Sequence, residues 1–343
     1  MRAGRESMSA LSSPSRRALL RQGGLLALLP ALGGCASLSA SLARHESGEL
    51  AARPTLLVAT TRKPVNGAQA KPWFGTERAS NMTIARARLI PPDEGRFSLA
   101  SVGLSDWQLD AVEPLSRIDD LFAASPDNRD VLIYVHGFNQ TFETAALDAA
   151  RLSDGIGFRG DTMVFAWPSK AKLFDYGYDR ESAMWSRDAL ERILSRLVAH
   201  PKIGRIHLVG HSVGTMLTME SLRQIYTRHG MAVAEKLGAV VFASPDIDMD
   251  VFSSSVERMP PVAPKITVIT ATNDRALALS GWMAGGTTRV GAAEKAQLEK
   301  LGLRVIDAST QGWGIINHDL FLSNAQIRIV IRRAIDGLPL DGA

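Results

Sequence analysis

A serine flanked by two glycines carries the strongest chemical signal in this sequence. Ser212 lies in Gly210-His211-Ser212-Val213-Gly214, directly after the mainly apolar run Ile206–Val209. A serine on a sharp strand-to-helix turn exposes its hydroxyl for nucleophilic attack, and the flanking glycines leave room for the crowded backbone. The amide of Val213, at the helix start, would then face a developing oxyanion. The pentapeptide alone also fits an ordinary turn in which a serine caps a helix.

Apolar runs of strand length alternate with helix-like segments from about residue 130 onward. Val131–Val135 is continuously apolar, as expected of a strand buried on both faces of a sheet. Glu181–His200 carries apolar residues at helical spacing. The alternation predicts right-handed crossovers and a mostly parallel sheet with helices on both faces, whose sites form at the carboxyl ends of the strands. Further helices are expected over Thr144–Ser153 and Val213–Arg228, and further strands over Met163–Ala166, Ala239–Ala243, Ile266–Thr270 and Leu303–Ile306.

Two earlier runs predict an antiparallel edge to this sheet. Thr55–Thr60 and Met82–Ile90 have strand character, and the second alternates as in a half-exposed edge hairpin. Turn signals lie between them, and a short helix is expected over Ser116–Ala124.

The charge distribution argues against a nucleic-acid partner. Of the 39 basic and 35 acidic residues, five arginines and one glutamate lie in residues 1–34, which leaves 34 of each sign in the rest of the chain. The basic character therefore belongs to the N-terminal segment, and the body of the protein is neutral.

The N-terminal segment predicts export and lipidation. Arg16-Arg17 precedes the apolar run Gly23–Leu32, which is too short for a permanent membrane span, and Leu32-Gly33-Gly34 leads into Cys35, the sole cysteine. This pattern resembles a bacterial lipoprotein leader, in which the cysteine receives lipid, and the Arg16-Arg17 pair resembles a twin-arginine export signal. A plain secretory signal with a chance cysteine is the alternative. We therefore expect a signal peptide over residues 1–34, a lipidated cysteine and flexible tether over 35–53, and a catalytic-type domain over 54–343.

The region from about residue 130 to 335 resembles the α/β-hydrolases. It is similar, more narrowly, to a family of poorly characterised bacterial esterase- and lipase-like hydrolases. The segments that carry this resemblance are VLIYVHGFNQTFETAA, FAWPSKAKLFDYGYDRESAMWSRDAL, VGHSVGT, FASPDIDMDVF and ATNDRALALS.

The resemblance implies a catalytic triad in the order serine, acid, histidine. With Ser212 as nucleophile, His318 is the one histidine beyond the helix that follows the serine, and it would act as general base. Asp274, after the strand Ile266–Thr270, is the expected acid, and Asp246 and Asp248 after the preceding strand are its rivals. Asp274 also fits a simple helix N-cap.

The resemblance places the oxyanion loop at His136-Gly137-Phe138. The backbone amides of Phe138 and Val213 are the expected donors, and His136 is expected to be structural. A metal site formed by His136 and His211 lacks supporting ligand spacing, so no metal or organic cofactor is expected.

For three further features, the sequence predicts no single function. Asp175–Arg180 matches the family's pattern, but no chemistry follows from it. The Gly-rich segment Gly281–Gly291 predicts either a mobile flap or a long loop. Several aromatic residues fit either an acyl pocket or the core: Trp167, Phe174, Tyr176, Tyr178 and Trp185.

The function expected from these features is a serine hydrolase that cleaves carboxylic esters at the cell envelope. The substrate would be an acyl ester, including a lipid, and the lipid anchor would hold the protein on a membrane facing the periplasm, with the outer membrane favoured by Ala36 after the cysteine. The alternatives are a thioesterase, amidase or peptidase using the same triad, and a non-catalytic lipoprotein that keeps the fold as a binding module.

Overall fold

The computed structural model describes residues 54–65, 70–92, 106–123, 125–283, 285–310 and 320–340. Contacts divide the chain into two units, Met1–Ala51 and Ala52–Ala343, and all described residues belong to the second. The predicted site residues Cys35 and His318 lie outside the described residues.

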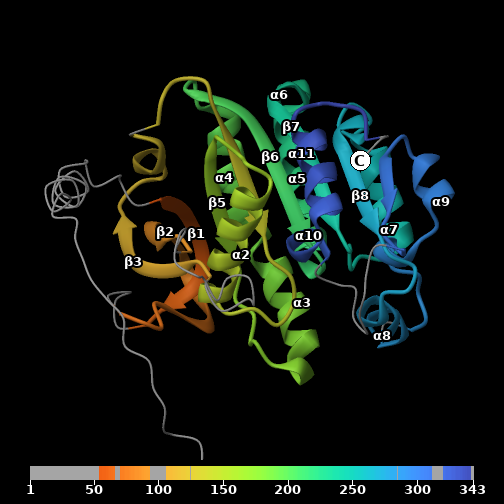
Figure 1. The fold of residues 1–343 in the computed structure, drawn as a ribbon, viewed down its shortest axis with the longest axis horizontal. Helices are drawn as coiled ribbons and strands as arrows, with labels where there is room; N and C mark the ends of the chain where they lie inside the picture. Colours follow the sequence, from red (N-terminus) through yellow and green to blue (C-terminus); the bar gives the residue numbers. More distant parts are fainter. Residues whose placement is uncertain are drawn as a thin grey trace, which may run out of the picture. The chain divides into compact units, whose positions relative to one another are not determined.

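A nine-stranded sheet forms the centre of the described domain, in the order β3-β2-β1-β5-β4-β6-β7-β8-β9 (Figure 1). The six strands β4 to β9 run parallel to their neighbours, and β1 joins them by parallel pairing with β5. The strands span Thr55–Pro64 (β1), Phe74–Ile90 (β2), Gln108–Leu115 (β3), Arg129–Val135 (β4), Asp161–Ala166 (β5), Ile203–His211 (β6), Leu237–Ala243 (β7), Ile266–Thr270 (β8) and Arg304–Asp307 (β9).

The N-terminal edge of the sheet is antiparallel, as predicted. β2 pairs antiparallel with β1 and with β3, which forms the outer strand. β3 was not predicted, because its sequence QLDAVEPL buries few residues and contains a proline. Pro114 fits this edge position, where a strand tolerates the loss of an amide donor.

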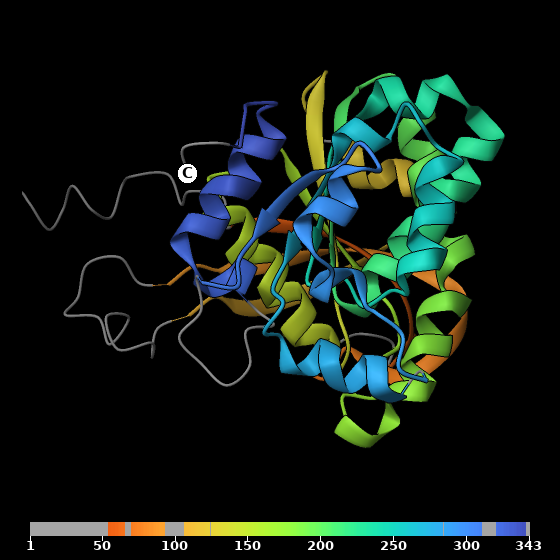
Figure 2. The ribbon, with the colours of Figure 1, turned by 90° about the vertical axis from the view of Figure 1, so that its right-hand side faces the viewer.

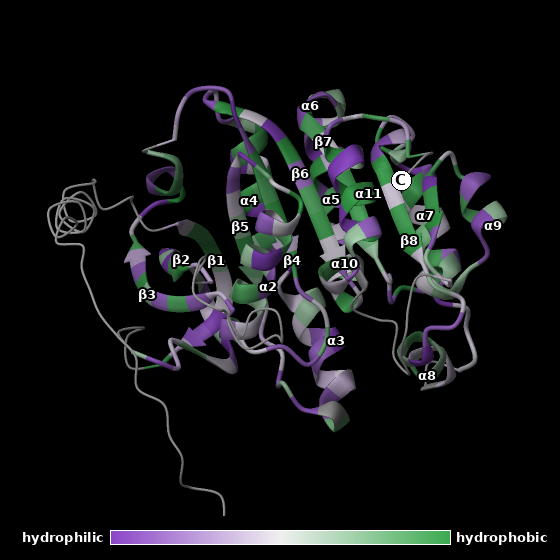
Figure 3. Ribbon diagram, viewed as in Figure 1, coloured by the Kyte–Doolittle hydropathy of each residue, from purple (hydrophilic) through white to green (hydrophobic). Residues whose placement is uncertain are grey.

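Helices cover both faces of the sheet, and successive strand residues divide between two cores. Leu208 packs on the face covered mainly by α3, α4, α5 and α7, whereas Val209 packs on the face covered by α2 and α11. Figure 2 shows these helices on opposite sides of the sheet, and Figure 3 shows the apolar colouring concentrated in the central strands. The helices span Phe142–Gly155 (α2), Tyr176–Trp185 (α3), Arg187–Ala199 (α4), Val213–His229 (α5), Met231–Lys236 (α6), Met249–Glu257 (α7), Arg275–Met283 (α8), Lys295–Glu299 (α9), Leu320–Ser323 (α10) and Ala325–Ile335 (α11).

The predicted helix Glu181–His200 is two helices, α3 and α4, separated at Ser186. The Ser186 hydroxyl donates to the Ser182 carbonyl at 2.8 Å and lies 2.8 Å from the Thr61 hydroxyl. A buried serine that bonds back to the preceding turn favours a bend, which explains the interruption. The short helix predicted at Ser116–Ala124 is a 3-10 turn over Ile118–Phe122.

Candidate active site

Ser212 occupies a strained turn between β6 and α5. Its backbone has φ 50° and ψ −121°, a left-handed region that non-glycine residues rarely adopt. Its amide donates to the Ala243 carbonyl at 3.0 Å, and its carbonyl accepts from the amides of Thr215 and Asp246. The side chain makes no capping hydrogen bond, so the simple helix-cap interpretation does not hold. The turn instead holds a buried serine at the carboxyl edge of the sheet.

Three glycines allow the backbone to close around this turn. A Cβ on Gly214 would lie 2.4 Å from the His136 carbonyl oxygen, and one on Gly210 would lie 3.2 Å from the Thr215 Cα. A Cβ on Gly137 would lie 3.0 Å from the Cβ of Ser212. The loop after β4 therefore packs directly against the serine turn, as the predicted oxyanion loop requires.

Two backbone N–H groups beside this turn have no acceptor among the described residues. They belong to Phe138, one residue after Gly137, and to Val213, the first residue of α5. The N-terminus of the 17-residue helix α5 also carries a partial positive charge. The site thus combines a serine hydroxyl with unpaired amide donors, the arrangement that stabilises an oxyanion.

His136 is a structural residue of the loop after β4. Its buried ring stacks on Trp167 with the ring centres 4.6 Å apart, and the Trp167 indole donates to the His136 carbonyl at 2.8 Å. Burial, aided by the nearby Arg62 charge, lowers the pKa of His136 to about 3. Its ring nitrogens face the carbonyls of Gly137 and Trp167, and the neutral ring can donate to one of them.

Two buried charged side chains, Arg62 and Asp179, hydrogen-bond to the same loop. The Arg62 guanidinium donates to the carbonyls of Gln140, Ser169 and Gly75, and burial lowers the pKa of Arg62 to about 10. The Asp179 carboxylate accepts from the Ser169 hydroxyl at 2.5 Å and from the Asn139 amide at 3.4 Å. Burial raises the pKa of Asp179. No sequence pattern predicts this role of Arg62, which reads only as a charged residue after an apolar strand.

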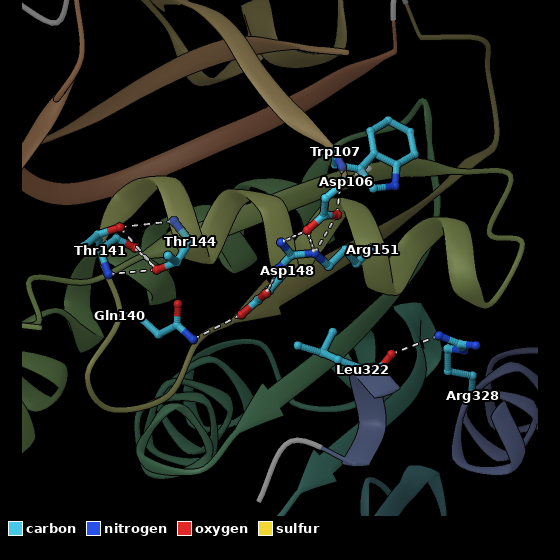
Figure 4. Close-up of polar contacts among 9 residues, drawn as sticks. All are labelled: Asp106, Trp107, Gln140, Thr141, Thr144, Asp148, Arg151, Leu322 and Arg328. Atoms are coloured by element: carbon cyan, nitrogen blue, oxygen red, sulfur yellow. Dashed lines mark hydrogen bonds and ion pairs between the residues drawn. The ribbon is translucent and has the colours of Figure 1, made fainter. Parts of the chain in front are cut away.

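The exit of the loop after β4 is fixed by the start of α2 (Figure 4). The Thr141 hydroxyl accepts from the Thr144 amide at 3.1 Å, and the Thr144 hydroxyl accepts from the Thr141 amide at 2.9 Å. The Gln140 side chain donates to Asp148, which also accepts from Arg151. These contacts hold the chain on both sides of the residue that would supply an oxyanion donor.

Asp274 lies at the predicted position, shortly after β8. Its side chain is 1% exposed, and Oδ1 accepts from the amides of Ala276 and Leu277 at 2.9 and 3.2 Å. Both cap bonds use the same oxygen, so Asp274 caps α8 and also places a buried carboxylate at the carboxyl edge of the sheet. The two interpretations of Asp274 from sequence are compatible.

Asp246 is committed to other partners. It forms a buried ion pair with Arg289, whose Nε lies 3.2 Å from its Oδ1, and it accepts from the hydroxyls of Tyr176 and Ser280 at 2.6 and 2.5 Å. Asp248 caps α7 through the amides of its first turn. These contacts favour Asp274 over both rivals as the partner of a histidine.

The described residues on either side of the segment that contains His318 contact chain neighbours of Asp274 and Ser212. Residues 311–319 are outside the described residues, but the Ser309 hydroxyl accepts from the Thr272 amide at 2.9 Å, two residues before Asp274. On the other side, the Phe321 ring lies 4.7 Å from the His211 ring, next to Ser212.

The Gly-rich segment is anchored rather than a free flap over its second half. The amides of Val290 and Gly291 donate to the carbonyls of Ile247 and Pro245, and the Met249 amide donates to the Thr288 carbonyl. A Cβ on Gly291 would lie 2.8 Å from the Pro245 nitrogen, so glycine is needed for this close pairing. The segment therefore positions the Arg289 side chain beside the Asp246 carboxylate.

The aromatic candidates divide between core and surface. Trp167 is fully buried, Tyr176 and Tyr178 are partly buried, and Trp185 is 43% exposed. Phe174 is 97% exposed, so it belongs neither to the core nor to an enclosed pocket.

The sheet order defines this protein as an α/β-hydrolase, together with the succession of strand β6, the Ser212 turn and helix α5. The chain belongs to the family described as "Alpha/beta hydrolase of unknown function (DUF900)", whose model matches residues 117–334. The resemblance inferred from sequence is thereby confirmed at the level of the superfamily.

Individual relatives are distant. The uncharacterized protein alr1448 of Nostoc sp. is 33% identical over 61 residues, so the match spans 18% of this chain and 16% of that relative. Among solved structures, Est1E from Butyrivibrio proteoclasticus has a TM-score of 0.40 and 12% identity over 74% of this chain and 96% of that one. A Pyrobaculum calidifontis esterase has a TM-score of 0.36 and 12% identity over 88% and 90%. The family membership, rather than these likenesses, assigns the fold.

The described residues contain neither a candidate membrane span nor a candidate metal-binding cluster. No helix there is long and apolar enough to cross a membrane. No three His, Cys, Asp or Glu side chains there are grouped to hold a metal ion.

The low pKa of His136 predicts that the free energy of unfolding depends on pH. Between about pH 6.5, the ordinary histidine value, and pH 3, the unfolded chain binds a proton at this residue that the folded chain does not. The free energy of unfolding should therefore fall as pH falls, by up to about 1.4 kcal/mol per pH unit from this group. His136→Gln should reduce that slope in urea-unfolding curves measured from neutral to mildly acidic pH, whereas the control His200→Gln should not. Equal slopes in wild type and His136→Gln would contradict the assignment.

Proposed function

We propose that this protein is a serine hydrolase that cleaves carboxylic esters through an acyl-enzyme on Ser212. The observation that carries the proposal is the strained Ser212 turn beside two amide donors without acceptors. Backbone strain of this kind amounts to about 1–3 kcal/mol and persists where the surrounding structure enforces it, commonly at functional sites. A binding module would have no need of this combination.

His318 is the proposed general base and Asp274 its orienting acid. The proposal for His318 rests on the order of residues in the sequence. It is supported by the described chain ends, which lie next to Thr272 on one side and His211 on the other. Asp274 is favoured because Asp246 is held by Arg289.

The proposed reaction proceeds in two acyl-transfer steps. The Ser212 hydroxyl attacks the ester carbonyl while His318 takes its proton, and the amides of Phe138 and Val213 stabilise the oxyanion, each worth about 3 kcal/mol at the transition state. The intermediate expels the alcohol, which receives the proton from His318, and leaves an ester on Ser212. Water, deprotonated by His318, then attacks this ester, and the intermediate releases the carboxylic acid while His318 returns the proton to the Ser212 oxygen.

Variants at the site should separate catalysis from structure. With para-nitrophenyl butyrate as substrate, we expect Ser212→Ala to lower kcat/KM at least a thousandfold and Asp274→Asn about a hundredfold or more. The control Asp248→Asn, at a helix cap, should leave kcat/KM nearly unchanged. Parallel assays with a thioester and an anilide test the thioesterase and amidase alternatives. Full activity in folded Ser212→Ala would overturn the mechanism.

We propose further that the protein acts at the cell envelope, anchored by lipid on Cys35. The leader pattern before this sole cysteine supports the proposal. The chain from Cys35 to the first described residue is long enough to act as a tether. The acyl-ester substrate would then be met on the periplasmic side of the membrane.

Membrane fractionation of the expressing bacterium tests the anchor. Wild type should sediment with membranes and partition into detergent, because the lipid supplies its membrane affinity. Cys35→Ala should move the protein to the soluble periplasmic fraction, whereas the neighbouring control Ser37→Ala should behave as wild type. Membrane retention of Cys35→Ala would refute lipid anchoring.

A further inference from the structure

The segment Asp175–Arg180, whose pattern predicts no chemistry, leads into α3 and connects the site to its surroundings. The Tyr176 hydroxyl donates to the Asp246 carboxylate, and the Asp179 carboxylate accepts from the Asn139 amide in the loop after β4. The Tyr178 ring makes cation–π contacts with the side chains of Arg78 and Lys170. These contacts fix the start of α3, in which Arg180 is the next residue.

Arg180 is a partly buried cation without an acidic partner among the described residues. Its Nη2 lies 3.5 Å from the Met216 sulfur, and its guanidinium carbon lies 5.9 Å from the centre of the Tyr176 ring. The neighbouring acids on α3 are engaged elsewhere, since Asp179 faces Ser169 and Glu181 lies 4.0 Å from Arg78. A guanidinium between a thioether and an aromatic ring lacks the charged hydrogen-bond acceptors that it ordinarily pairs with.

The surroundings of Arg180 connect it to the nucleophile and to the oxyanion loop. Met216 lies four residues after Ser212, one helical turn into α5. The Tyr176 ring packs edge-on against the Phe138 ring, with ring centres 5.4 Å apart. Arg180 therefore contacts the helix that follows Ser212 directly, and the Tyr176 ring connects it to Phe138, which would donate to the oxyanion.

We propose that Arg180 binds a negatively charged group, a carboxylate in the first instance, on the ester substrate. This inference rests on the proposed function of Ser212. The planar guanidinium suits bidentate binding of a carboxylate, and its partial desolvation by Met216 and Tyr176 strengthens such a contact. The substrates would thus be anionic esters, such as half-esters of dicarboxylic acids, rather than purely apolar lipids.

Matched pairs of substrates test the charge preference on each side of the ester bond. Mono-para-nitrophenyl succinate and para-nitrophenyl butyrate differ by a carboxylate on the acyl side. Para-acetoxybenzoate and its methyl ester differ by a carboxylate on the alcohol side. For wild type, we expect the charged member of at least one pair to have the higher kcat/KM. Arg180→Gln should lower that value roughly ten- to a hundredfold, mainly through KM, with the neutral partner little changed.

Two further variants sharpen the test. Arg180→Lys keeps the charge and should retain part of the preference, whereas the exposed control Arg192→Gln on α4 should leave every value unchanged. Equal effects of Arg180→Gln on charged and neutral substrates, or no charge preference in wild type, would overturn the proposal. Turnover of the neutral esters reports separately on Ser212, so failure of this inference is distinguishable from failure of the proposed function.

Discussion

The site depends on one constraint: three chain segments meet at Ser212 more closely than side chains would allow. The loop after β4, the end of β6 and the start of α5 approach so nearly that a Cβ on Gly137 or Gly214 would overlap its neighbours. The strain at Ser212 is maintained because its amide and carbonyl are both bonded, to Ala243 and to the segment that begins α5. The position of the serine hydroxyl thus follows from backbone packing of the sheet edge.

Buried charges hold the segments that surround this turn. Arg62 ties the strand β1 to the loops after β4 and β5, and the Asp246–Arg289 pair ties the loop after β7 to the Gly-rich segment. Buried ion pairs add little net stability, because desolvation offsets the attraction, yet removal of one partner destabilises a protein by about 3–5 kcal/mol. We interpret these groups as fixing one arrangement of the loops. That rigidity is what preorganised oxyanion donors require.

Much of this framework could be predicted from sequence, for identifiable reasons. The continuously apolar runs Val131–Val135 and Ala239–Ala243 predicted β4 and β7, because strands buried on both faces admit few polar residues, and Gly210 and Gly214 marked the turn. The edge strand β3 and the break at Ser186 were missed, since partial burial and a single back-bonding hydroxyl leave no periodic signal. The roles of Arg62 and Arg289 could not be predicted, because they depend on contacts between residues far apart in the chain. The buried contacts of Asp246, which favour Asp274 as the proposed acid, likewise depend on residues far apart in the chain.

The most direct measurement is the site of covalent modification by a fluorophosphonate, which reacts with activated serines. The purified protein would be labelled, digested and analysed by mass spectrometry, with heat-denatured protein as the control. The account predicts a single adduct on the peptide that contains Ser212, formed only in the folded state, since the turn and its amide donors create the reactivity. An adduct on another serine, or none on folded protein that hydrolyses esters, would contradict it.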